Sequence, residues 1–134
     1  MPHELGDQTG PGDHALTYEG DGSADAGDSV AIDQTSGQAS QTNSGDTDGS
    51  EEFAGVAHFD FGSAGDNENV LVHAPTGVIA NVASGVSAGE RLGPSTTAGQ
   101  LGPSAGGPVL AVSDEGGTSS TGDSLAAGTA EVSF

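Results

Sequence analysis

The sequence contains no cysteine and only one Lys or Arg side chain, Arg91. Without cysteine there can be no disulfide and no thiolate chemistry, so a fold must be stabilised by packing and hydrogen bonds. Binding to nucleic acid requires several Lys or Arg residues that neutralise phosphates, and one arginine does not meet this requirement. The same shortage excludes attachment to an anionic membrane. Nucleic acid and membrane are therefore set aside as partners.

Long apolar runs are also missing. No stretch approaches the roughly 18 apolar residues of a spanning helix, and no basic start followed by an apolar run indicates a signal peptide. The sequence therefore predicts a soluble chain made in the cytoplasm.

Large apolar side chains are few, because Leu, Ile, Val and Phe make up only 23 of 134 residues. A fraction this low, combined with high net charge, is typical of disordered chains. Here, however, the apolar residues gather in short alternating runs bounded by turn residues, which favours strands. We predict a thin-cored β domain that gains burial by oligomerising or by docking.

Carboxylates dominate the charge, with 20 Asp and Glu and a net charge of -19. Such a surface repels itself in dilute buffer. At 1 M salt the Debye length falls to about 3 Å, so most of this repulsion is screened. The composition therefore indicates a protein adapted to concentrated salt.

The β-favouring runs recur about every ten residues, and no segment has the 3.6-residue period of a helix. They are Leu16–Glu19, Ser29–Asp33, Gln38–Thr42, Phe53–Phe61, Asn69–Ala74, Gly77–Ala83, Glu90–Leu92, Gln100–Leu101, Val109–Asp114 and Ala130–Phe134. We predict an all-β fold with almost no helix, a small single-domain barrel or sandwich over 15–134, preceded by a flexible, extended N-terminal arm over 1–14.

The sequence also predicts which strands pair and which face of a strand is buried. The first three runs suggest two hairpin-like units, Pro75-Thr76 suggests a tight turn between two central strands, and 43–52 reads as an exposed loop. Alternation in Phe53–Phe61 places Phe53 and Ala57 on one face and Val56 on the other, and predicts one core face. Recurrent Gly-Asp pairs are interpreted as turns that Asp caps with its own carboxylate.

The order of several segments carries a resemblance: "YEGDG", "AGDSVAID", "FAGVAHFD", "ENVLVHAPTGVIANVASG", "VSAGERLGPSTTAGQL" and a closing "GPVLAVSDEGGTSSTGDSLAAGTAEVSF". Taken together, this order resembles the capsid decoration or cement proteins of tailed viruses. The extreme acidity and the polar loop at 43–52 depart from that family, and with the missing lysine they resemble a virus of halophilic archaea.

The resemblance implies an all-β, β-tulip-like protein without catalytic activity or cofactor. It would stand as a homotrimer on the outer surface of the virion, bound to the major capsid protein, after synthesis in the host cytoplasm. Apolar anchors near the arm, Leu5, Leu16 and Tyr18, are candidate capsid or subunit contacts. Arg91 joins them because a lone cation among 20 carboxylates is expected to have acidic neighbours, although an ordinary exposed arginine is an equal alternative.

The sequence gives little support for a metal site or a catalytic site. Asp46, Asp48 and Glu51 surround a glycine as in the start of a calcium loop, but the remaining ligands of that motif are missing, and a solvated acidic loop is favoured. His58 and His73 fall on strands that could be neighbours, without the spacing of a zinc site. No nucleophile elbow or phosphate loop occurs, so we expect no enzyme.

Two other functions stay open. One is a cell-surface or adhesion module of a halophile, and the other is an acidic disordered spacer.

Overall fold

The computed structural model describes residues 5–6, 15–19, 23–33, 37–42, 51–57, 69–73 and 77–133. For 15–19, 69–73 and residues 33, 51 and 52, only the backbone is described. Strands and turns account for the regular structure of these ranges, and no helix occurs in them. Each of the ten predicted runs coincides with an observed strand, so the predicted all-β fold is confirmed.

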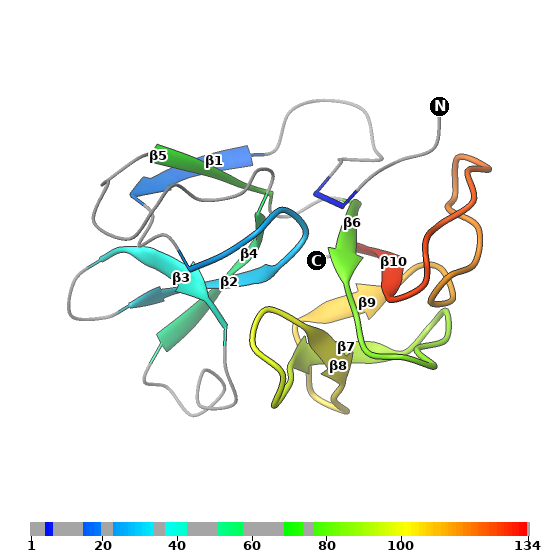
Figure 1. Cartoon of the computed structure of the whole chain (residues 1–134). Coiled ribbons are helices and arrows are strands. Elements are labelled where there is room, and N and C mark those ends of the chain that lie inside the picture. The colour runs from blue at the N-terminus through cyan, green and yellow to red at the C-terminus, as the bar shows by residue number, and fades with distance from the viewer. Residues whose placement is uncertain are drawn as a thin grey trace.

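The first sheet is formed entirely by strands within residues 15–73 (Figure 1). Its spatial order is β1-β5-β4-β2-β3, with antiparallel neighbours throughout. The strands are β1 Ala15–Glu19, β2 Ser29–Asp33, β3 Ala39–Gln41, β4 Glu51–Ala57 and β5 Asn69–His73. The predicted hairpin between the second and third runs is thus confirmed, whereas β1 pairs with β5 and not with β2.

The second sheet has the spatial order β6-β10-β9-β7-β8, again antiparallel. Its strands are β6 Val78–Asn81, β7 Arg91–Pro94, β8 Leu101–Pro103, β9 Val109–Ala111 and β10 Thr129–Ser133. A parallel bridge between Val82 and Leu101 joins the ends of the two edge strands. The sheet therefore curls almost into a small barrel, which shields backbone groups that an open edge would expose.

The tight-turn hairpin predicted around Pro75-Thr76 is wrong, because β5 and β6 belong to different sheets. The prediction that both strands are central also fails for β6, which is an edge strand. Its edge is nevertheless covered, since Gly6 N donates to Ile79 O at 2.7 Å and Asn81 N donates to Gly27 O at 2.8 Å. The near-continuous apolar sequence of β6 is explained by this covering of its edge by other segments of the chain.

Both faces of β4 are buried, which corrects the prediction of one core face. Register against β2 shifts between Val30 and Ala31, so a bulge falls at Ala54. The bulge reverses the alternation, and Phe53 and Val56 both reach the larger core, while Ala57 packs in the smaller one. The strand also begins at Glu51, inside the segment that was expected to be a loop.

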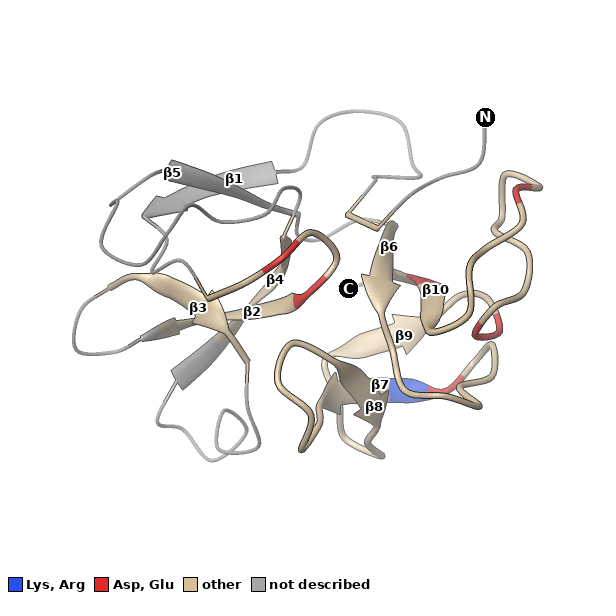
Figure 2. Ribbon diagram, viewed as in Figure 1, with Lys and Arg blue, Asp and Glu red and all other residues tan. Residues whose placement is uncertain are grey.

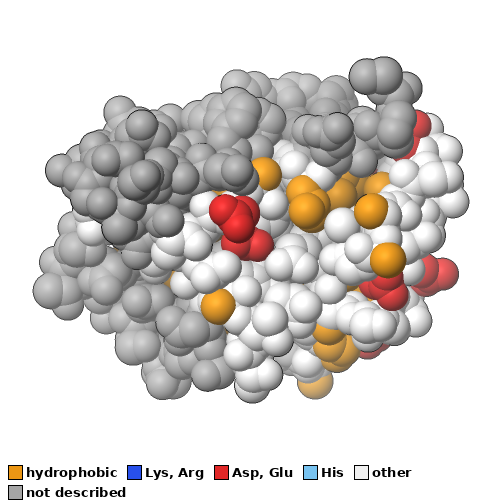
Figure 3. Space-filling model, in the orientation of Figure 1, with side chains coloured by type: hydrophobic (Ala, Val, Ile, Leu, Met, Phe, Trp, Pro, Cys, Tyr) orange, Lys and Arg blue, Asp and Glu red, His pale blue; other side chains and the backbone are white. Residues whose placement is uncertain are grey.

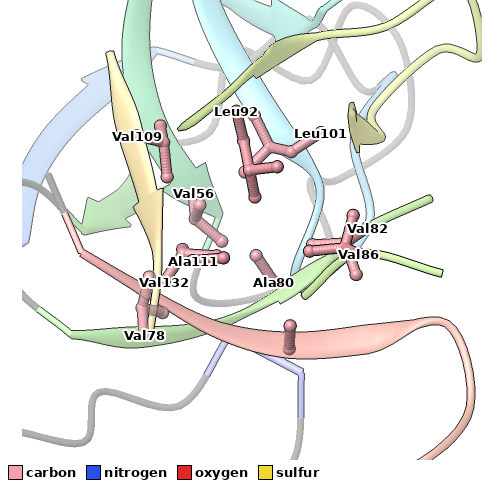
Figure 4. Packing of buried hydrophobic residues seen from close by; sticks show 11 residues of the cluster. Val56, Val78, Ala80, Val82, Val86, Leu92, Leu101, Val109, Ala111 and Val132 are labelled. Atoms are coloured by element: carbon pink, nitrogen blue, oxygen red, sulfur yellow. The ribbon is translucent and has the colours of Figure 1, made fainter. Parts of the chain in front are cut away.

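Among the described residues, the core consists mostly of Val and Ala side chains with a few Leu and Ile. Its larger cluster combines Val56 of the first sheet with Val and Leu side chains of the second, so the two sheets pack on each other (Figure 4). Among the described side chains, the smaller cluster is centred on Ala24, Val30, Ala39 and Ala57. No aromatic side chain among the described residues is fully buried.

Candidate functional site

A buried polar junction connects the two sheets. Asp28, at the start of β2, is 6% exposed. Its carboxylate accepts from Gln41 Nε2 at 2.9 Å, from Asn81 Nδ2 at 3.2 Å and from the backbone N–H of Asp25 at 3.0 Å. Asn81 belongs to the second sheet, so one carboxylate holds both sheets together. Burial of a charged group is tolerated here because several donors replace water.

The turn between β7 and β8 enters the same junction. Ser29 N donates to Gly99 O at 2.8 Å, and Gly99 N donates to Thr42 O at 2.9 Å. The buried hydroxyls of Ser29 and Thr42 bond to each other beside this turn. Gly99 adopts φ +75, and a Cβ there would lie 2.7 Å from Cγ of Asp28 and from Nε2 of Gln41. The position therefore requires glycine both for its backbone conformation and for space.

Acidic side chains elsewhere also bind backbone N–H groups. Glu90 accepts from Ser87 N at 2.7 Å, and Asp114 accepts from Ala88 N at 2.8 Å. With one Arg and no Lys in the chain, amides serve as the donors that cations usually provide.

Glu115 shows the electrostatic effect of such contacts. Its carboxylate accepts from Gly128 N at 2.7 Å and from Gly85 N at 3.2 Å. These bonds, that from Gly128 first, hold the pKa of Glu115 below its usual value because they favour the charged form. The segment that leads into β10 is thereby attached to the turn after β6.

Glu131 is a buried carboxylate in the middle of β10, with 3% of its surface exposed. Ser120 donates to it through its backbone N–H at 2.5 Å and its hydroxyl at 2.7 Å. The backbone N–H of Glu131 donates in turn to Ser113 Oγ at 2.9 Å. The long loop between β9 and β10 is thus folded back over the strand that follows it.

An exposed surface near β7 and β9 combines the single arginine of the chain with two apolar side chains. Arg91, Leu110 and Val112 are all exposed there, and we call these three residues the arginine face. Leu110 is paired across the strands with Arg91, so the two side chains leave the sheet on the same side. Figure 2 shows the single blue segment at the start of β7, and Figure 3 shows apolar side chains in small groups on one face of the molecule.

The predicted contact residues lie on separate segments of the chain. Leu5 lies against Gly27 at the start of the first sheet, with 37% of its surface exposed. The side chains of Leu16 and Tyr18 on β1 lie outside the described residues. Arg91 is exposed on β7, and no ion pair is found between it and the carboxylates that the structure describes.

The metal candidates fall largely outside the described part of the chain. Asp46, Asp48 and His58 lie outside it, and Glu51 and His73 are described only as strand backbone. Where side chains are described, no three His, Cys, Asp or Glu residues are grouped as metal ligands. In that same part, no helix is long and apolar enough to cross a membrane.

Sequence reasoning missed the roles of Asp28 and Glu131. Asp28 was interpreted only as a turn residue, and it does close its own turn, since Asp28 N donates to Asp25 O at 3.0 Å. The signal for Glu131 was available, because a Glu at a position flanked by Ala130 and Val132 in a strand is unusual in so small a core.

Comparisons with known proteins do not identify the chain. No protein-family model matches it, and a search of the curated proteins finds no match.

Proposed function

We propose that this chain is a non-enzymatic virion protein that decorates and stabilises the outside of an icosahedral capsid, as a homotrimer bound to the major capsid protein. The observation that supports the proposal is the coincidence of strands with the segments whose order resembles the decoration proteins of tailed viruses. "AGDSVAID" contains β2, "FAGVAHFD" most of β4, and "VSAGERLGPSTTAGQL" contains β7, the turn after it and the first residue of β8.

The architecture fits this role better than the alternatives. Two sheets with a shared core do not suit an acidic disordered spacer. A thin core suits a protein that gains burial on a larger surface, because a small domain buries a smaller fraction of its surface on folding than a large domain does. The acidic surface suits a virion exposed to molar salt, where like charges are screened.

Co-sedimentation with undecorated capsids in 2 to 3 M KCl tests the proposal. We expect the full-length chain to sediment with the shells, in a fixed ratio to the major capsid protein. A chain without residues 2–12 should fold, as judged by circular dichroism, but bind the shells more weakly, because Leu5 and the rest of the arm are candidate contacts.

The outcomes separate the hypotheses. A full-length chain that sediments with no shell contradicts the decoration proposal, and binding to host cell envelopes instead would support the adhesion module. Equal sedimentation of both forms would show that the arm makes no contact with the capsid.

A further inference from the structure

Gly27 lies where the two sheets meet. It precedes β2 by two positions, is buried and adopts φ +85. Its backbone N–H donates to Ala57 O, at the end of β4, at 3.0 Å, and its carbonyl accepts from Asn81 N, at the end of β6, at 2.8 Å. Gly27 is therefore bonded to both sheets, and we call Gly27 together with Ile79 and Asn81 of β6 the seam.

Residues 5 and 6 lie on this seam, as the short dark-blue trace beside β6 in Figure 1 shows. Gly6 N donates to Ile79 O at 2.7 Å. Alternate residues of a strand direct their backbone groups to the same side, so the groups of Ile79 and Asn81 share one side of β6. Gly6 and Gly27 together occupy that side, which faces away from β10.

The side chain of Leu5 fills the space that glycine leaves at position 27. A Cβ on Gly27 would lie 2.5 Å from Cδ2, 2.7 Å from Cβ and 3.0 Å from Cγ of Leu5. The Leu5 side chain therefore rests directly on the backbone of Gly27. A backbone hydrogen bond to an edge strand, together with a side chain seated beside it, is the way in which extended segments add to sheets.

We infer that Leu5 and Gly6 form a strap that closes the seam. Gly6 attaches the strap to β6 of the second sheet, and Leu5 packs on Gly27, which is bonded to β4 of the first sheet. The strap thus stabilises the contact between the sheets from outside the core. It also protects one side of β6, because an uncovered edge strand can pair with another chain.

The strap gives Leu5 a role within the free chain, and this inference does not rest on the proposed function. Leu5 cannot pack on Gly27 and on a capsid with the same atoms. A capsid contact through Leu5 would therefore require the strap to open, at the cost of the contact with Gly27.

Hydrogen exchange of backbone amides, followed by NMR on the free, full-length protein in 3 M KCl, tests the inference. We expect the Gly6 amide to exchange at least about tenfold more slowly than an unstructured amide, because it donates to Ile79 O. Leu5→Ala should bring its rate close to the unstructured value. Leu5→Met keeps an apolar side chain of similar size and should retain most of the protection.

Leu110→Ala is the matched control. Leu110 is the same residue type, lies on β9, and has the same exposed fraction as Leu5, 37%. Its substitution should leave the exchange rate of the Gly6 amide unchanged. Circular dichroism in the same buffer checks that every variant is folded.

An unprotected Gly6 amide in the wild type would overturn the inference. So would protection that survives Leu5→Ala, or protection that Leu110→Ala removes to the same extent. The measurement contains no shells, whereas capsid binding is measured by co-sedimentation. Failure of the strap and failure of the decoration role can therefore be told apart.

Discussion

At the scale of single residues, two positions contribute most to the packing of the two sheets: a glycine whose backbone conformation and surroundings exclude a side chain, and a buried carboxylate. Gly99 carries the contact between the β7–β8 turn and the first sheet, and Asp28 gathers donors from both sheets. Neither residue is large or apolar. Specific polar contacts therefore fix how two thin layers pack, because Val and Ala side chains alone leave several arrangements close in energy.

Gly99→Ala should destabilise the fold by about 2 to 4 kcal/mol, since it combines strain at φ +75 with a clash against the Asp28 carboxylate. Gly106→Ala is the control, because its Cβ would meet no atom within 4 Å and its φ is not left-handed. That substitution should change stability by less than about 1 kcal/mol. Urea unfolding of both variants in 3 M KCl gives the comparison, and equal midpoints would refute the role of the turn.

At the scale of elements, the strands were predictable but their partners were only partly so. Alternation and turn residues depend on local sequence, which is why all ten strands coincide with predicted runs. The pairing of β2 with β3 was also predicted correctly. The pairing of β1 with β5 was missed because it joins segments about 50 residues apart, and no local signal marks it.

The residues of the candidate site were likewise only partly predictable from the sequence. Arg91 could be singled out from composition, because a lone cation is visible by counting. The exposed pair Leu110 and Val112 required the structure, since the run that contains them was expected to lie in a strand without a stated face. The junction at Asp28 depends on contacts between sheets, which a linear sequence does not display.

The loop segment before β10 carries a pH prediction. The pKa of Glu115 is lowered in the folded protein by the amides of Gly128 and Gly85, so its contribution to stability is present above the ordinary carboxyl value of 4.5. That contribution should be lost as the pH falls through the lowered pKa. Glu115→Gln should reduce the unfolding midpoint at pH 7 and make the decline below pH 4.5 less steep than in the wild type.

Thermal unfolding of the two proteins between pH 3 and pH 7, in 3 M KCl, measures this effect. Asp25→Asn is the control, because Asp25 is exposed and no bond to its carboxylate is found among the described residues. Parallel curves for the wild type and Glu115→Gln across this range would contradict the assignment.

At the scale of the whole molecule, a net charge of -19 opposes compaction of a domain with a thin core. Salt screens the repulsion between these charges and so lowers the free-energy cost of folding. The carboxylates that accept hydrogen bonds from backbone amides favour the fold at low and at high salt. The unfolding temperature should therefore rise between 0.2 and 3 M KCl. Differential scanning calorimetry measures it, and a flat or falling midpoint would remove the argument for adaptation to salt.

The most direct test of the central claim, that this protein stabilises a capsid from outside, is the temperature at which packaged DNA becomes accessible to an intercalating dye. Filled shells with and without the bound protein are heated in 3 M KCl, with occupancy checked by co-sedimentation. The account predicts dye access at a distinctly higher temperature for decorated shells. The same temperature for fully decorated and bare shells would contradict it.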